Sequence, residues 1–156
     1  MNNKGQITVE YILLMSILVI IILSSTSILY HEIEKNKILN AAQIGAQTGV
    51  DKNGYAMYYN DTFNNYYENY QKLLTPTEIK IIQINMEEEN NTLSLEVVTH
   101  SVNSLTNTEK YVVGSRINYY VRKAISESFQ INTNDTYYTN IKTRSYEIKT
   151  KNVKWV

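Results

Sequence analysis

Hydrophobic positions are concentrated near the N-terminus, where an uninterrupted apolar run extends from Tyr11 to Tyr30. The run contains no charged residue, no Gly and no Pro. About twenty such residues in an α-helix span about 30 Å, which is the thickness of the hydrocarbon core of a bilayer. Tyr11 and Tyr30 bracket the run, and tyrosine rings favour the two headgroup levels of a membrane. The pattern therefore predicts a membrane helix with these two tyrosines as interfacial anchors.

The helical pattern continues past Tyr30 into a stretch rich in small residues. Ala41, Gly45 and Gly49 fall four apart and therefore lie on one stripe of a helix. Small residues at this spacing allow a second backbone to approach closely. The residues that follow Gly49 also have turn chemistry that ends a helix, so packing and termination are two alternative explanations of the glycines. We expect one helix over residues 6–49, about 65 Å long, whose outer half lies against the rest of the chain or other copies.

The clearest alternation of apolar and polar residues appears after residue 77. Residues 78–86 and 92–99 alternate with the period of two that a half-buried strand requires, and residues 87–91 between them have the composition of a turn. This predicts a β-hairpin. Before it, the apolar and aromatic side chains of residues 61–74 repeat at intervals of three and four, which favours a short helix. An adhesive aromatic surface is the alternative interpretation of that segment.

The C-terminal part of the chain adds a helix and two strand-like segments. Apolar side chains from Val112 to Phe129 have helical spacing, and a helix beginning near Ser115 is expected. Residues 137–148 and 153–156 resemble strands. The predicted fold class is therefore α+β: a long N-terminal hydrophobic helix, followed over residues 50–156 by a small, mostly antiparallel β-sheet domain with one or two short helices. Laying the sheet on the outer half of the long helix would bury both apolar surfaces.

Composition and motifs exclude several functional classes. Lys and Arg number 15 and Asp and Glu number 15, so no net field attracts nucleic acid. The chain has no Cys, which excludes disulfides, thiolate catalysis and thiolate metal sites. It also lacks HExxH, GxSxG, P-loop and dinucleotide-binding motifs. Glu87, Glu88 and Glu89 are consecutive and do not converge as the ligands of a calcium loop do. We expect no enzyme activity, no cofactor and no metal site.

Three acceptor sequences for N-glycosylation begin at Asn60, Asn90 and Asn134. All three lie in predicted loops of the part that follows the long helix. Some arise by chance in a chain this rich in Asn, but all of them fall on the side of the membrane that we expect to be exported. Glycans can therefore be added at these three positions once this part of the chain is outside the cell.

One carboxylate, Glu10, stands where the apolar run begins. An intramembrane carboxylate costs about 2.5–3.5 kcal/mol unless it is paired, although one at a helix end can also snorkel to the headgroups. Lys4, Gly5 and Gln6 precede it. The order basic residue, Gly, Gln, three residues, Glu and apolar helix resembles the class III signal peptide of archaeal type IV pilin-like proteins, the prepilin family. The resemblance covers about residues 1–50.

This resemblance implies a processing and assembly route. A prepilin peptidase would cut between Gly5 and Gln6 on the cytoplasmic side, so that residues 1–5 are a leader. Glu10 would then pair with the new amine of Gln6 in a neighbouring subunit, because a carboxylate in low dielectric gains most from an opposite charge. The implied partners are the membrane, a pilus assembly ATPase and platform protein, and other pilins in a homo- or hetero-polymer.

The expected function is that of a structural subunit of a surface filament used in adhesion or surface attachment. The only positive charges before the apolar run are Lys4 and the initiator amine. The positive-inside rule therefore places this short end in the cytoplasm and residues 50–156 outside. One alternative is a single-pass surface protein that carries a small binding domain and does not polymerise. Another is a secreted protein cut near residues 24–27, although its apolar region would exceed the usual length of about 7–15 residues.

Overall fold

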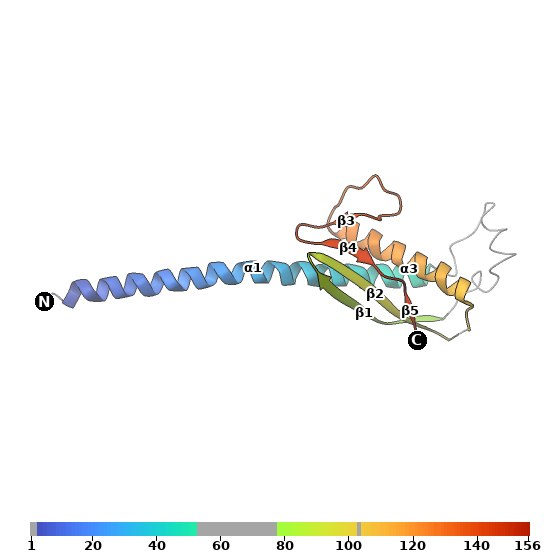
Figure 1. Cartoon of the computed structure of the whole chain (residues 1–156), viewed down its shortest axis with the longest axis horizontal. Coiled ribbons are helices and arrows are strands. Elements are labelled where there is room, and N and C mark those ends of the chain that lie inside the picture. Colours follow the sequence, from blue (N-terminus) through green and yellow to red (C-terminus); the bar gives the residue numbers. More distant parts are fainter. Residues whose placement is uncertain (1–2, 53–77, 103) are drawn as a thin grey trace. The chain divides into compact units, whose positions relative to one another are not determined.

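The structure is a computed structural model, and it describes residues 3–52, 78–102 and 104–156. The chain divides into two compact units, residues 1–36 and residues 37–156. Helix α1 (Asn3–Asp51) contributes to both units, and all other elements belong to the second (Figure 1). The helix predicted over residues 61–74 lies outside the described residues.

Helix α1 confirms the long N-terminal helix, with its ends at Asn3 and Asp51 instead of the predicted residues 6 and 49. The apolar run contains four hydroxyl groups whose partners the structure shows. Ser16, Ser24, Ser25 and Thr26 each donate to the carbonyl oxygen four residues earlier, at 2.8 Å. Since these hydroxyls are satisfied within the helix, they add little to the cost of placing the segment in hydrocarbon.

Strands β1 (Ile79–Glu89) and β2 (Thr92–Ser101) form the predicted antiparallel hairpin. The predicted turn over residues 87–91 is too long, because residues 87–89 pair with β2. The turn is Asn90 and Asn91, with φ angles of 47° and 63°. Two consecutive left-handed residues match the twist of an antiparallel pair, and Asn tolerates this conformation better than most side chains.

The remaining strands complete a mixed sheet and confirm the α+β class. Strands β3 (Ile141–Lys142), β4 (Glu147–Thr150) and β5 (Lys154–Trp155) give the order β1-β2-β4-β3, with β5 also paired to β2. The pairs β1–β2 and β3–β4 are antiparallel, whereas β4 and β5 run parallel to β2. Parallel pairing requires a crossover connection, and the helix between β2 and β4 lies within it.

Helix α3 (Asn107–Ser128) begins well before the predicted start near Ser115. A capping box explains the earlier start: the Thr106 hydroxyl accepts from the backbone N–H of Glu109 at 3.3 Å, and the Glu109 carboxylate accepts from the backbone N–H of Thr106 at 2.7 Å. The two bonds satisfy donors that a helix N-terminus otherwise leaves unpaired.

Removing the cap should weaken the second unit measurably. Thr106→Ala should lower the free energy of unfolding by about 1 kcal/mol, because the N–H of Glu109 loses its acceptor. Thr106→Ser should restore most of the loss, and Thr108→Ala, in the same turn, should change it by less than about 0.5 kcal/mol. Urea denaturation of the detergent-solubilised chain measures all three. Equal losses in Thr106→Ala and Thr108→Ala would show that the cap does not stabilise the helix.

Residues 37–51 of α1 share one hydrophobic core with α3 and the sheet. The core contains Ile38, Ala41, Ala42, Ala46 and Val50 of α1, Leu93, Leu95 and Val97 of β2, and Val113, Ile117, Val121 and Ile125 of α3. A Cβ atom added to Gly45 would lie 2.7 Å from Cα of Val121, and one added to Gly49 would lie 2.8 Å from Cα of Ile117. The small-residue stripe therefore serves close packing, and its partner is α3 of the same chain.

Candidate functional site

The apolar segment of α1 is the first candidate site. Within residues 3–52, 78–102 and 104–156, α1 is the single helix long and apolar enough to cross a membrane, as judged by length and composition. None of its most apolar stretch is buried against the parts of the chain that the structure describes. Leu23 and Ile28, for example, are each 67% exposed. A helix of this kind is compatible with membrane anchoring, because its apolar side chains have no cover among the residues that the structure describes.

The residues predicted for processing, assembly and anchoring all lie on α1. Gly5, Gln6 and Glu10 belong to its first turns, and Glu10 is exposed. Tyr11 and Tyr30 are 60% and 62% exposed. At about 1.5 Å per residue they stand about 29 Å apart along the helix axis, close to the thickness of the hydrocarbon core. The helix therefore gives the two tyrosines the separation that the anchor prediction requires.

Two of the three predicted glycosylation positions lie on exposed loops. Asn90 occupies the hairpin turn, Asn134 lies in the loop after α3, and Asn60 lies outside the described residues. The loop at Asn134 is ordered by its neighbour Asp135, which accepts from the backbone N–H groups of Tyr137 at 2.9 Å and Thr139 at 2.6 Å. Hydrogen bonds from the Thr139 hydroxyl and backbone and from the Tyr137 backbone lower the pKa of Asp135.

The prediction that a strand begins at residue 137 is wrong, because these hydrogen bonds hold residues 137 and 139 in a loop. Arg122 adds a second tie, because its Nε donates to the backbone oxygen of Tyr137 at 3.2 Å. Tyr138 has a φ angle of 54°, which an extended strand excludes. The pairing therefore begins at Ile141, and residues 137–140 remain in the loop.

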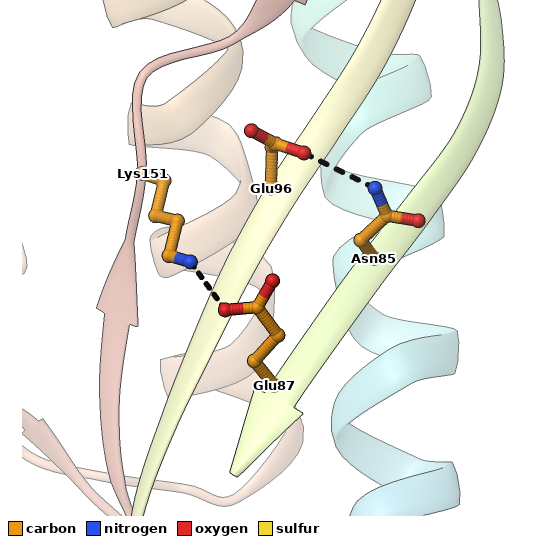
Figure 2. Close-up of polar contacts among 4 residues, drawn as sticks. All are labelled: Asn85, Glu87, Glu96 and Lys151. Atoms are coloured by element: carbon orange, nitrogen blue, oxygen red, sulfur yellow. Dashed lines mark hydrogen bonds and ion pairs between the residues drawn. The ribbon is translucent and has the colours of Figure 1, made fainter. Parts of the chain in front are cut away.

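The three consecutive glutamates lie at the end of β1 and include a residue that pairs with a lysine. Figure 2 shows Glu87 accepting from Nζ of Lys151, and Asn85 donating to Glu96 at 3.1 Å, on the sheet face that points away from the helices. The hydrogen bond to Glu87 raises the pKa of Lys151. In the described ranges no group of three or more His, Asp or Glu side chains could hold a metal ion. The Glu87–Lys151 contact joins β1 to the residue that follows β4, and the Asn85–Glu96 hydrogen bond joins β1 to β2.

A polar pocket in the second unit was not anticipated from the sequence. It has a volume of about 240 Å³ and lies between the first half of α3 and residues 152–155. Aromatic rings of Tyr111 and Trp155 and the amide of Asn118 contribute to its lining. Tyr111 and Asn118 lie on α3, whereas Trp155 comes from a distant part of the chain, and no sequence spacing relates it to them.

In comparison with known proteins, no protein family model, no curated protein and no solved structure matches the chain. The functional interpretation therefore depends on the chain's own residues. Two features carry it, the order of residues 4–10 and the uncovered apolar helix that follows them.

Proposed function

We propose that the protein is a structural subunit of an archaeal type IV pilus-like surface filament, made as a precursor that is cleaved between Gly5 and Gln6. The observation that carries the proposal is the uncovered apolar stretch of α1, which directly follows the ordered set Lys4, Gly5, Gln6 and Glu10. A contiguous apolar surface of this size requires a cover in water. A bilayer supplies one before assembly, and neighbouring subunits supply one afterwards.

In the proposed filament, the second unit would be the folded head displayed on the outside. Its core includes residues from α1, β2 and α3, so residues 37–51 of α1 are an integral part of a folded head. The same helix thus provides an apolar stretch for the membrane or the filament core and an anchoring surface for the head. Prepilin peptidase, the assembly ATPase and the platform protein are the partners that this route requires.

Glu10 distinguishes this proposal from an ordinary membrane anchor. Cleavage after Gly5 would create a free amine at Gln6, and that amine would offset the cost of holding a carboxylate at the edge of hydrocarbon. A plain anchor creates no such amine. The filament proposal thus gives a reason for the acidic side chain at the start of the apolar helix.

The N-terminal residue of the mature protein tests the proposal. We expect intact-mass measurement of the membrane and surface-filament fractions to show a chain that begins at Gln6. A chain that begins at Met1 would favour a single-pass surface protein that does not polymerise. A chain that begins near Ser27 would instead identify a secreted protein, and either result would overturn the prepilin assignment.

A further inference from the structure

We propose that the pocket between α3 and residues 152–155 binds a neutral saccharide unit of about hexose size. The pocket belongs to the second unit and shares no residue with the apolar stretch of α1. Binding there is a further activity beyond the filament role, and it would give the displayed head a ligand of its own.

The lack of a side chain at Gly114 allows residues 152–155 to lie close to α3. Gly114 forms part of the lining, and a Cβ atom added to it would lie 3.2 Å from Cβ of Val153. Tyr111, Ser115 and Asn118 lie three or four residues apart along α3, so they share one face of the helix. Residues 152–155 close the other side. The pocket is partly open, and its volume of about 240 Å³ lies just below the usual range of about 300–1,000 Å³ for ligand sites, so it suits no more than a single sugar ring.

The polar groups of the lining can both donate and accept hydrogen bonds. Asn107, Asn118 and Asn152 contribute amides and Ser115 contributes a hydroxyl, and each of these side chains carries a donor and an acceptor. Sugar hydroxyl groups have the same dual character. Asn118 is only 8% exposed; its Nδ2 donates to the backbone oxygen of Lys151 at 2.8 Å, and its Oδ1 has no partner among the described residues. Since Oδ1 of Asn118 has almost no accessible surface, the exposed side chains of Asn107, Ser115 and Asn152 are the ones that can meet a sugar hydroxyl.

Aromatic rings and charge narrow the ligand class further. Tyr111 is 68% exposed at the pocket, and Trp155 is half-buried there. Tyrosine and tryptophan present an apolar face with a polar edge, which suits the C–H face of a sugar ring. Lys110 is the one charged side chain in the described lining, and no carboxylate is present to hold a cation. A single half-buried lysine beside several amides suits a neutral polyol better than an anion that needs several donors.

Trp155 makes the proposal directly testable, because it is the only Trp of the chain and lines the pocket. We expect the Trp emission of the detergent-solubilised full chain to change saturably with at least one of D-glucose, D-galactose, D-mannose and N-acetyl-D-glucosamine, with a Kd of about 1 mM. Tyr111→Ala should weaken that binding about five- to tenfold through lost stacking. Tyr137→Ala provides the matched control, since Tyr137 is 69% exposed and does not line the pocket.

Several outcomes would overturn the proposal. One is that the Trp155 emission responds to none of the four sugars. Another is that Tyr111→Ala and Tyr137→Ala weaken sugar binding equally. A third is that inorganic phosphate binds saturably and the sugars do not. The measurement requires neither cleavage nor assembly. A mature chain that begins at Gln6 but gives no sugar response would therefore overturn the pocket proposal and leave the filament proposal standing. A chain that begins at Met1 but binds a sugar would overturn the filament proposal and leave the pocket proposal standing.

Discussion

Gly45→Leu should lower the free energy of unfolding of the second unit by about 3 kcal/mol or more. The cause is the close contact between α1 and α3: a Cβ atom on Gly45 would meet backbone atoms of Tyr120 and lie 2.7 Å from Cα of Val121. Backbone atoms within a helix cannot move aside one at a time. The two helices must separate, and overpacking of a core costs about 1–3 kcal/mol even for smaller insertions.

Gly45→Ala gives a sharper test because two effects predict opposite signs. Helix propensity alone would stabilise α1 by about 1 kcal/mol. The contact with α3 should outweigh this gain and leave a net destabilisation of about 1 kcal/mol. Gln43→Leu is the matched control, since Gln43 lies exposed on the same helix and Leu and Gln have similar propensities.

The measurement is urea denaturation of the full chain in detergent, followed by the emission of Trp155. A stabilised Gly45→Ala variant would show that α1 and α3 do not pack at the separation described. A Gly45→Leu variant no less stable than Gln43→Leu would lead to the same conclusion. Since one residue is changed at a time, the result isolates the helix contact from the rest of the core.

The long helix and the hairpin could be predicted because their periods are local. The apolar run from Tyr11 to Tyr30 and the alternation within β1 and β2 each specify one conformation without reference to the rest of the chain. Helix α3 was placed too late because the β-branched Val112 and Val113 weakened the helical pattern near its start. The pair Thr106 and Glu109, three residues apart, was the sequence signature of the true N-terminus.

Features that join distant segments could not be predicted. The segments 137–148 and 153–156 resemble strands in the sequence and contain β3 and β5, but no local period shows that β4 and β5 run parallel to β2. The parallel pairing follows from the helical crossover that returns the chain. The pocket could not be predicted for the same reason, since tertiary packing alone brings Tyr111 and Trp155 to one pocket. For the small-residue stripe, spacing indicated a close contact, and only the structure identified α3 as the partner.

Glu10→Leu should leave membrane insertion and cleavage unchanged and should sharply reduce filament assembly. Leucine makes the apolar segment more hydrophobic, and Gly5 and Gln6 remain in place for the peptidase. An amine left unpaired in a low-dielectric contact costs about 3 kcal/mol, and 1.4 kcal/mol is already a factor of ten in an equilibrium constant. The loss applies to each subunit added, so the filament yield should fall by well over tenfold.

The position of the carboxylate should matter as much as its presence. Glu10→Gln keeps the shape of the side chain without its charge and should reproduce the assembly defect. In the double variant Glu10→Leu with Leu14→Glu, the carboxylate moves one helical turn, about 6 Å, out of register with the incoming amine, so assembly should not recover. Gly5→Val supplies the reference for an unprocessed precursor, because a side chain at the cut should block the peptidase.

The quantity to compare is the ratio of sheared surface filament to mature protein retained in the membrane, measured in each strain by quantitative immunoblotting. Wild type and Glu10→Gln should have equal amounts of mature protein and should differ in filament alone, which separates assembly from folding and processing. An unchanged ratio in Glu10→Leu would remove the assembly role from this carboxylate. Glu10 would then be a residue that snorkels to the headgroups of a plain membrane anchor, at a cost that the helix end makes small.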